Sequence, residues 1–139
     1  MVGNGILLLS KRYVSMYTYI LTNKGGERMT NSKNEFGNFL RDMIKQTGIS
    51  QASFYAGVEI TKPYFYDILS GKVNPPPPEI QYKMLDNLQI NENQRKEFLN
   101  LAAKGRNEIP ADIAKLITEH PKELDKIRVT LEMLFATKG

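Results

Sequence analysis

Residue types that perform covalent or metal chemistry are scarce in this sequence. Its 139 residues contain no cysteine and a single histidine, His120. A zinc site needs several Cys or His ligands, and a catalytic triad needs a nucleophile with its base, so we expect no metal, cofactor or catalytic residue. The polar side chains suited to hydrogen-bond chemistry instead gather between residues 49 and 74: Gln51, Thr61, Lys62, Tyr66, Asp67 and Lys72.

Two short helices joined by a tight turn are predicted for this stretch, over residues 50–57 and 62–69. Ser50 and Thr61 are suitable N-cap residues, because a side-chain oxygen can accept an otherwise unpaired backbone N–H. Pro63 lies in the first turn of the second helix, where its missing N–H has no cost, and Gly71 ends that helix. Apolar side chains should hold the pair together at a steep angle: Phe54, Val58, Ile60, Phe65 and Ile68.

This pattern resembles the helix-turn-helix of the lambda-repressor and Cro-like regulators, the XRE family. Ile49-Ser50-Gln51 matches the family's start of the first helix, and Ile60-Thr61-Lys62 matches the end of the turn. The remaining family positions fall in register without a gap: Tyr64, Ile68, Gly71, Lys72, Asn74 and Pro75. The resemblance implies an all-α domain of about five helices that binds double-stranded operator DNA as a transcriptional regulator, acting as a repressor.

Two positions depart from the family pattern. The family has Ala where Tyr55 stands, because the two helices cross closely there. It has Gly where Glu59 stands, because the turn takes a left-handed backbone, and a non-glycine residue there costs on the order of 1 kcal/mol. The sequence therefore predicts either a reshaped turn or a turn in which Gly57 takes part of this role.

Residue by residue, the resemblance places five side chains on the outward face of the second helix: Thr61, Lys62, Pro63, Tyr66 and Asp67. A helix fits the major groove of B-DNA, and its outward side chains then meet base edges. Gln51 begins the first helix, where its side chain and nearby amides can reach a phosphate. Lys72 lies just past the second helix and can bind another phosphate.

Each of these roles has a simpler alternative. Lys62 either donates to guanine or is merely solvated. Tyr66 either contacts a thymine methyl or a phosphate, or is an ordinary exposed tyrosine. Asp67 either accepts from cytosine, or caps the helix or pairs with Lys62. Tyr64, beside Phe65, is expected to pack rather than to read bases.

The net charge of +4 is unevenly distributed along the chain. Residues 29–76 hold five basic and four acidic side chains, and residues 77–139 hold ten of each. Most of the positive balance therefore lies in residues 1–28, so DNA binding is argued from the motif rather than from bulk charge. With few basic groups, one domain should bind DNA weakly, and a dimer on a symmetric operator would double the contacts.

Residues 1–28 differ in composition from the rest and form an N-terminal extension without helical periodicity. They could form a strand or hairpin, or a basic tail that contacts phosphate. A secretory signal is not indicated, because the apolar run Ile6-Leu7-Leu8-Leu9 is short and the charges follow it. Lys24-Gly25-Gly26, shortly before Met29, is also what an in-frame ribosome-binding sequence would encode. We therefore expect residues 1–28 to be either a flexible tail or a translated leader before a start at Met29.

Helical periodicity begins after Asn31 and defines a domain over residues 29–105. The first helix, capped by Asn31 or Ser32 and ended by Gly48, should turn inward Phe36, Phe39, Leu40, Met43 and Ile44. Pro75 to Pro78 should form a rigid loop, the alternative being a ligand for a proline-recognising partner. A helix over 79–88 and another after Asn91 would complete the domain, with inward Ile80, Met84, Leu85, Leu88, Phe98, Leu99 and Ala102.

Residues 106–139 form a C-terminal helical extension. The segment 104–110 and the short helix after it are similar to the tail of small XRE-type regulators from Gram-positive bacteria. Ile113, Leu116 and Ile117 should face inward in that helix, and His120 should cap a last helix beginning at Pro121. The stripe Leu124, Ile127, Leu131, Leu134 and Phe135 is expected either to form a homodimer or to dock on the domain core.

Three classes of function are considered for such a sequence. The leading interpretation is a cytoplasmic DNA-binding regulator. The second is an antitoxin-type or other protein-binding module, in which the last two helices bind a partner and the helix-turn-helix provides autoregulation. An enzyme is disfavoured, because no nucleophile–base set and no phosphate-binding glycine loop is present. No apolar run approaches the roughly 20 residues that cross a bilayer, so no membrane contact is expected.

Overall fold

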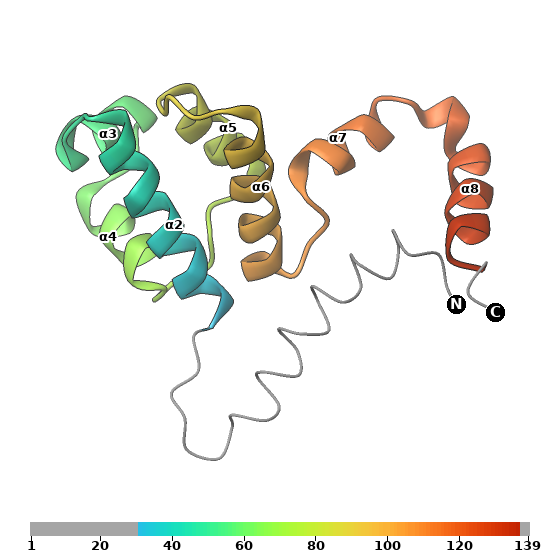
Figure 1. Ribbon diagram of the computed structural model, residues 1–139, viewed down its shortest axis with the longest axis horizontal. Helices are drawn as coiled ribbons and strands as arrows, with labels where there is room; N and C mark the ends of the chain where they lie inside the picture. Colours follow the sequence, from blue (N-terminus) through green and yellow to red (C-terminus); the bar gives the residue numbers. More distant parts are fainter. Residues whose placement is uncertain (1–30, 137–139) are drawn as a thin grey trace, which may run out of the picture. The chain divides into compact units, whose positions relative to one another are not determined.

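The computed structural model describes residues 31–136 (Figure 1). All regular structure in this range is helical, as predicted. The α-helices are α2 (Ser32–Thr47), α3 (Gln51–Val58), α4 (Lys62–Ser70), α5 (Pro78–Asp86), α6 (Glu92–Arg106), α7 (Ala111–Thr118) and α8 (Leu124–Ala136), with a short 3-10 helix, η1 (Pro121–Glu123), before the last. The N-terminal extension, its proposed strand or hairpin and the leader hypothesis lie outside the described residues.

Side-chain caps begin four of these helices, where sequence reasoning placed them. Each cap oxygen accepts a backbone N–H three residues ahead, at 2.8 to 3.3 Å. The cap residues are Asn31, Ser50, Thr61 and Asn91. Because these bonds satisfy donors that the helix itself leaves unpaired, they fix where each helix starts.

Two glycines end helices in the left-handed conformation. Gly48 follows α2 with φ 88°, and Gly71 follows α4 with φ 78°. A side-chain carbon at Gly71 would overlap the Asn34 side chain, whereas one at Gly48 would meet nothing within 4 Å. Gly71 is therefore required both by its backbone angle and by the close approach of α2.

The core lies among α2 to α6, and most of its members were predicted. Its fully buried large side chains include Phe36, Leu40, Phe54, Phe65, Ile68, Met84, Phe98 and Leu99. Three predicted inward residues, Phe39, Ile60 and Ile80, are half-buried and pack against this cluster. The apolar periodicity in residues 31–103 therefore identified the buried faces correctly.

Helix α2 is the central element, since it packs against both α4 and α6. Its Phe36 meets Phe98 of α6 edge to face, with ring centroids 5.1 Å apart. Glu35 and Lys104 form a half-buried ion pair of 3.1 Å between the same helices. On the α4 side, the backbone of Leu69 lies so close to Gly37 that no side chain fits there.

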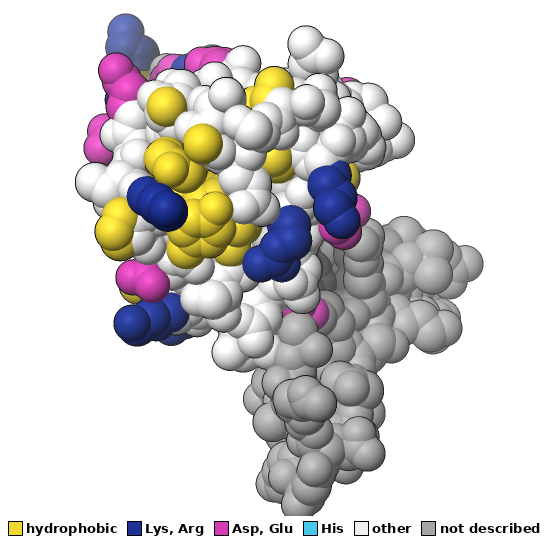
Figure 2. All heavy atoms as spheres, turned by 90° about the vertical axis from the view of Figure 1, so that its left-hand side faces the viewer, with side chains coloured by type: hydrophobic (Ala, Val, Ile, Leu, Met, Phe, Trp, Pro, Cys, Tyr) yellow, Lys and Arg dark blue, Asp and Glu magenta, His cyan; other side chains and the backbone are white. Residues whose placement is uncertain are grey.

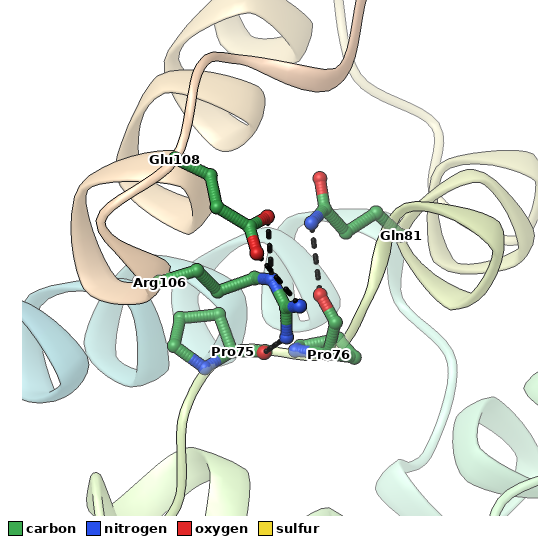
Figure 3. Close-up of polar contacts among 5 residues, drawn as sticks. All are labelled: Pro75, Pro76, Gln81, Arg106 and Glu108. Atoms are coloured by element: carbon green, nitrogen blue, oxygen red, sulfur yellow. Dashed lines mark hydrogen bonds and ion pairs between the residues drawn. The ribbon is translucent and has the colours of Figure 1, made fainter.

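The four-proline segment is a rigid loop built into the domain (Figure 3). Pro75 and Pro76 are completely buried, and Pro78 begins α5. Arg106 donates to the Pro75 carbonyl at 3.0 Å and forms a bidentate ion pair with Glu108. Gln81 donates to the Pro76 carbonyl at 2.8 Å. These contacts favour the structural role predicted for the prolines over the alternative of a free ligand.

The described residues separate into two compact units, 31–115 and 116–136. Helix α7 spans this division, and only its first residue, Ala111, belongs to the buried core. Ile113 and Leu116 are 48% and 61% exposed, and Ile117 is half-buried, so the prediction that all three face inward was wrong. The helical period is as expected, but the core that these residues should face ends at Ala111.

Helix α8 contains no buried residue among its thirteen. Its predicted stripe is exposed at Leu124, Leu131 and Phe135, which are 41%, 44% and 55% accessible. His120 is the N-cap residue of η1, which begins at Pro121 as expected, but its side chain makes no capping hydrogen bond. Its Nδ1 lies 2.7 Å from the Leu116 carbonyl of the preceding helix instead. Within residues 31–136, no helix is both long and apolar enough to cross a membrane.

Candidate nucleic-acid interface

The candidate interface is built from α3, a three-residue turn and α4. Ser50 and Thr61 cap the two helices, and Glu59 takes the left-handed conformation that turns the chain between them, with φ 67° and ψ 40°. The Ile60 N–H donates to the Tyr55 carbonyl at 3.1 Å and closes the end of α3. The turn thus has the backbone form that glycine usually supplies, without a glycine.

Neither alternative predicted for this turn is correct. The turn is not reshaped, and Gly57 lies inside α3 and does not replace Glu59. Gly57 serves packing, because a side chain there would overlap Asn87. The Glu59 carboxylate accepts from Lys83 of α5 at 2.9 Å, and this partner holds the pKa of Glu59 below its ordinary value. The strained position therefore gains a contact that glycine could not make.

Aromatic rings connect α3 and α4 at their crossing. The buried rings of Phe54 and Phe65 lie 5.9 Å apart, and Tyr55 stands 5.3 Å from Phe65. Tyr55 is half-buried and also meets Tyr66 edge to face, at 6.5 Å. Tyr55 stands where the family pattern has Ala. Its larger side chain extends the core into a row of rings that reaches the surface.

The predicted site residues lie on α3, on α4 and on the residues that flank α4. Five of them are exposed: Thr61, Lys62, Pro63, Tyr66 and Lys72. Two are half-buried: Gln51 at the start of α3 and Asp67 in the middle of α4. Lys62 and Pro63 occupy the first two positions of α4, so their side chains lie at its N-terminal end.

A hydrogen bond that the sequence did not predict joins two of these residues. The Tyr66 hydroxyl donates to the side-chain oxygen of Gln51 at 2.9 Å. This bond connects the middle of α4 to the first residue of α3. It orients the Gln51 amide group, whose two N–H donors have no partner in the part of the chain that the structure describes. No local sequence signal could have indicated it, because the two residues are 15 positions apart.

Asp67 does not pair with Lys62, which was one of its predicted alternatives. Within residues 31–136 the ion pairs lie elsewhere. The backbone carbonyl of Asp67 accepts the N–H of Lys72 at 3.0 Å and the Ser70 hydroxyl at 3.2 Å. This closure holds the backbone of Lys72 against the end of α4, two residues past Ser70, and its side chain is exposed.

Tyr64 packs inward, as predicted. It is half-buried against the core cluster, and this burial raises the pKa of its phenol, opposed by the charge of Arg106. Tyr64 belongs to the support of α4 rather than to its outward surface.

Figure 2 views the side of the molecule on which α3 and α4 lie in Figure 1. Hydrophobic side chains form a patch on this side, and separate Lys and Arg side chains stand around it together with several Asp and Glu side chains. The arrangement offers apolar ring surface, two lysine amines and one oriented amide, which suits hydrogen bonding and nonpolar contact. No cluster of three or more potential metal ligands occurs within residues 31–136. Comparisons with protein-family models, with curated proteins and with solved structures found no match to this chain.

Proposed function

We propose that this protein is a sequence-specific, double-stranded DNA-binding regulator of the XRE type, with α4 as its recognition helix. The observation that carries the proposal is the α3–turn–α4 arrangement, in which two capped helices meet at a left-handed turn and α4 keeps one face exposed. A helix presented in this way can enter the major groove while the preceding helix contacts the backbone. A repressor of transcription in the bacterial cytoplasm is the form of regulator that we infer.

The proposed contacts divide into two kinds. Lys62, Tyr66, Thr61, Pro63 and Asp67 would face base edges, while Gln51 and Lys72 would bind phosphate. Gln51 supports this division, because its oxygen is occupied by Tyr66 and its amide donors remain for an anionic partner. Lys72 supports it by its exposed position just beyond α4.

Binding to DNA from the protein's own upstream region tests this proposal. The full chain is titrated against the native duplex and against a scrambled duplex, at several salt concentrations. Preference for the native duplex is expected, and Lys72→Ala should lower the salt slope by about 1, because one phosphate contact is lost. The matched control is Lys96→Ala on α6, an exposed lysine outside the candidate interface. Equal affinity for both duplexes would refute sequence-specific binding.

We also propose that α8 forms a homodimer contact, which would let two domains bind a symmetric operator. The exposed side chains of α8, among them Leu131, Met133 and Phe135, support this. They equally support the second candidate function, a module that binds another protein through its last two helices. Sedimentation of the full chain and of a Leu131→Glu variant tests the homodimer. A chain that stays monomeric at every concentration would leave the second candidate as the better explanation of α8.

A further inference from the structure

The part of the α4 surface formed by Pro63 and Tyr66 offers few hydrogen-bond donors for reading bases. Pro63 and Tyr66 are three positions apart and therefore lie on the same face of the helix, and both are exposed. Proline has no side-chain donor or acceptor. The single O–H of Tyr66 is already donated to Gln51, at 2.9 Å. What this part of α4 presents is therefore mainly hydrocarbon and ring surface.

The Tyr66 ring is also held in place by contacts with two neighbouring aromatic rings. Phe65 and Tyr55 meet it edge to face, with centroids 5.1 and 6.5 Å away. Its hydroxyl bond to Gln51 fixes the far end of the side chain. A ring that is fixed at both ends loses little entropy when a partner docks, so it suits a specific nonpolar contact better than a mobile side chain would.

The major groove presents one prominent apolar feature, the C5 methyl group of thymine. We propose that Pro63 and Tyr66 form a nonpolar reading surface for thymine methyl groups, and that Tyr66 is at the same time a positioning residue that aims the Gln51 amide at a phosphate. This inference rests on the proposed function, and it names the base feature that the recognition helix selects. Because the Tyr66 O–H is donated to Gln51, the Tyr66 ring can contact a base and the Gln51 amide can donate to a phosphate of the DNA backbone.

The test uses deoxyuridine, which pairs as thymidine does but lacks the methyl group. The full chain first selects duplexes from a random 20-base-pair library. Each thymidine of the selected duplex is then replaced singly by deoxyuridine, and the dissociation constant is measured. At one or more positions the replacement should weaken binding about fourfold, the effect of one buried methyl-sized group.

Two variants separate the roles of the ring and the hydroxyl. Tyr66→Ala should bring the ratio of the dissociation constants for the deoxyuridine and thymidine duplexes close to one. Tyr66→Phe, which keeps the ring, should retain this ratio and weaken binding to both duplexes by the same factor. Lys62→Ala is the matched control on the same helix, and it should leave the ratio unchanged while lowering both affinities.

The outcomes distinguish this inference from the proposed function. A selected duplex that binds specifically but tolerates every deoxyuridine would overturn methyl reading and leave DNA binding intact. Retention of the ratio in a folded Tyr66→Ala variant would show that another side chain reads the methyl. Failure to select any sequence would refute the proposed function itself, and methyl reading would fall with it.

Discussion

Residues 31–115 and residues 116–136 carry similar apolar patterns but bury them to different degrees. In the first unit, side chains such as Phe36 and Phe98 are completely inaccessible. In the second, Phe135 is 55% exposed and no residue of α8 is buried. Both patterns have helical spacing, so the spacing alone does not decide burial. The difference teaches that an amphipathic stripe indicates a need for a partner, and that the partner must be found elsewhere.

The test with the largest expected effect on stability removes one phenylalanine from each unit. Phe98→Ala should lower the free energy of unfolding by about 3–5 kcal/mol, because it leaves a cavity beside Phe36. Phe135→Ala should change it by less than about 0.5 kcal/mol at high dilution, because the ring is exposed. Denaturant titration followed by circular dichroism measures both. A loss for Phe135→Ala that grows with protein concentration would support the proposed homodimer contact of α8, whereas a large loss even at high dilution would contradict the exposure of this ring.

A second test compares two glycines of the first unit that share a backbone angle but differ in surroundings. Gly48→Ala should cost about 1–2 kcal/mol, since only its left-handed conformation is strained. Gly71→Ala should cost about 1–3 kcal/mol more, because the new methyl group must also displace Asn34. Thermal and denaturant unfolding of both variants checks this order. Equal losses would mean that α2 and α4 separate easily, and that the close approach of Gly71 to Asn34 is not tightly held.

Substitutions at Glu59, in the left-handed turn, should change the free energy of unfolding by an intermediate amount. Glu59→Gly relieves the left-handed strain and Glu59→Ala does not, while both lose the ion pair with Lys83. The glycine variant should therefore be more stable than the alanine variant by about 1 kcal/mol. Lys83→Ala is the control that removes the ion pair alone. It should lower the free energy of unfolding by less than this difference, because both partners are largely exposed. The reverse order of the two Glu59 variants would show that the turn changes shape when the pair is lost.

The smallest expected effect is a dependence on pH. Arg106 holds the pKa of Glu108 below its ordinary value through their hydrogen bonds. A carboxyl group whose pKa is lowered on folding stabilises the fold above its unfolded pKa, and this contribution disappears as the pH falls through the folded pKa. Unfolding of Glu108→Gln should therefore respond less to acidification than the parent chain does. Asp125→Asn, which breaks an exposed pair with Arg128, is the control and should leave the stability of the first unit unchanged.

Local features were predictable from the sequence because their partners are close along the chain. The caps at Ser50, Thr61 and Asn91 each bond a residue three positions ahead. The inward faces of α2, α5 and α6 follow from periodicity. These signals were sufficient for the helices and most of the core.

Tertiary features were not predictable in the same way. The sequence does not reveal the bond between Glu59 and Lys83, since it depends on the placement of α5. Ile113 and Leu116 were expected inside, but the core ends before they are reached. In the candidate interface, the outward positions followed from the resemblance, whereas the Tyr66–Gln51 bond needs two helices in register. The roles of these residues toward DNA stay predictions.

The packing of α2 against α6 has a consequence for synthesis of the protein on the ribosome. Glu35 and Lys104, which join these helices, are 69 positions apart, and nearly the whole domain lies between them. Helices α3 and α4 therefore leave the ribosome well before the helix that completes their core. A chain that must close such a long loop folds late, and its apolar faces stay open to chaperones until then. The packing that supports the candidate interface should form only once translation has passed α6, so a product truncated before α6 would lack it.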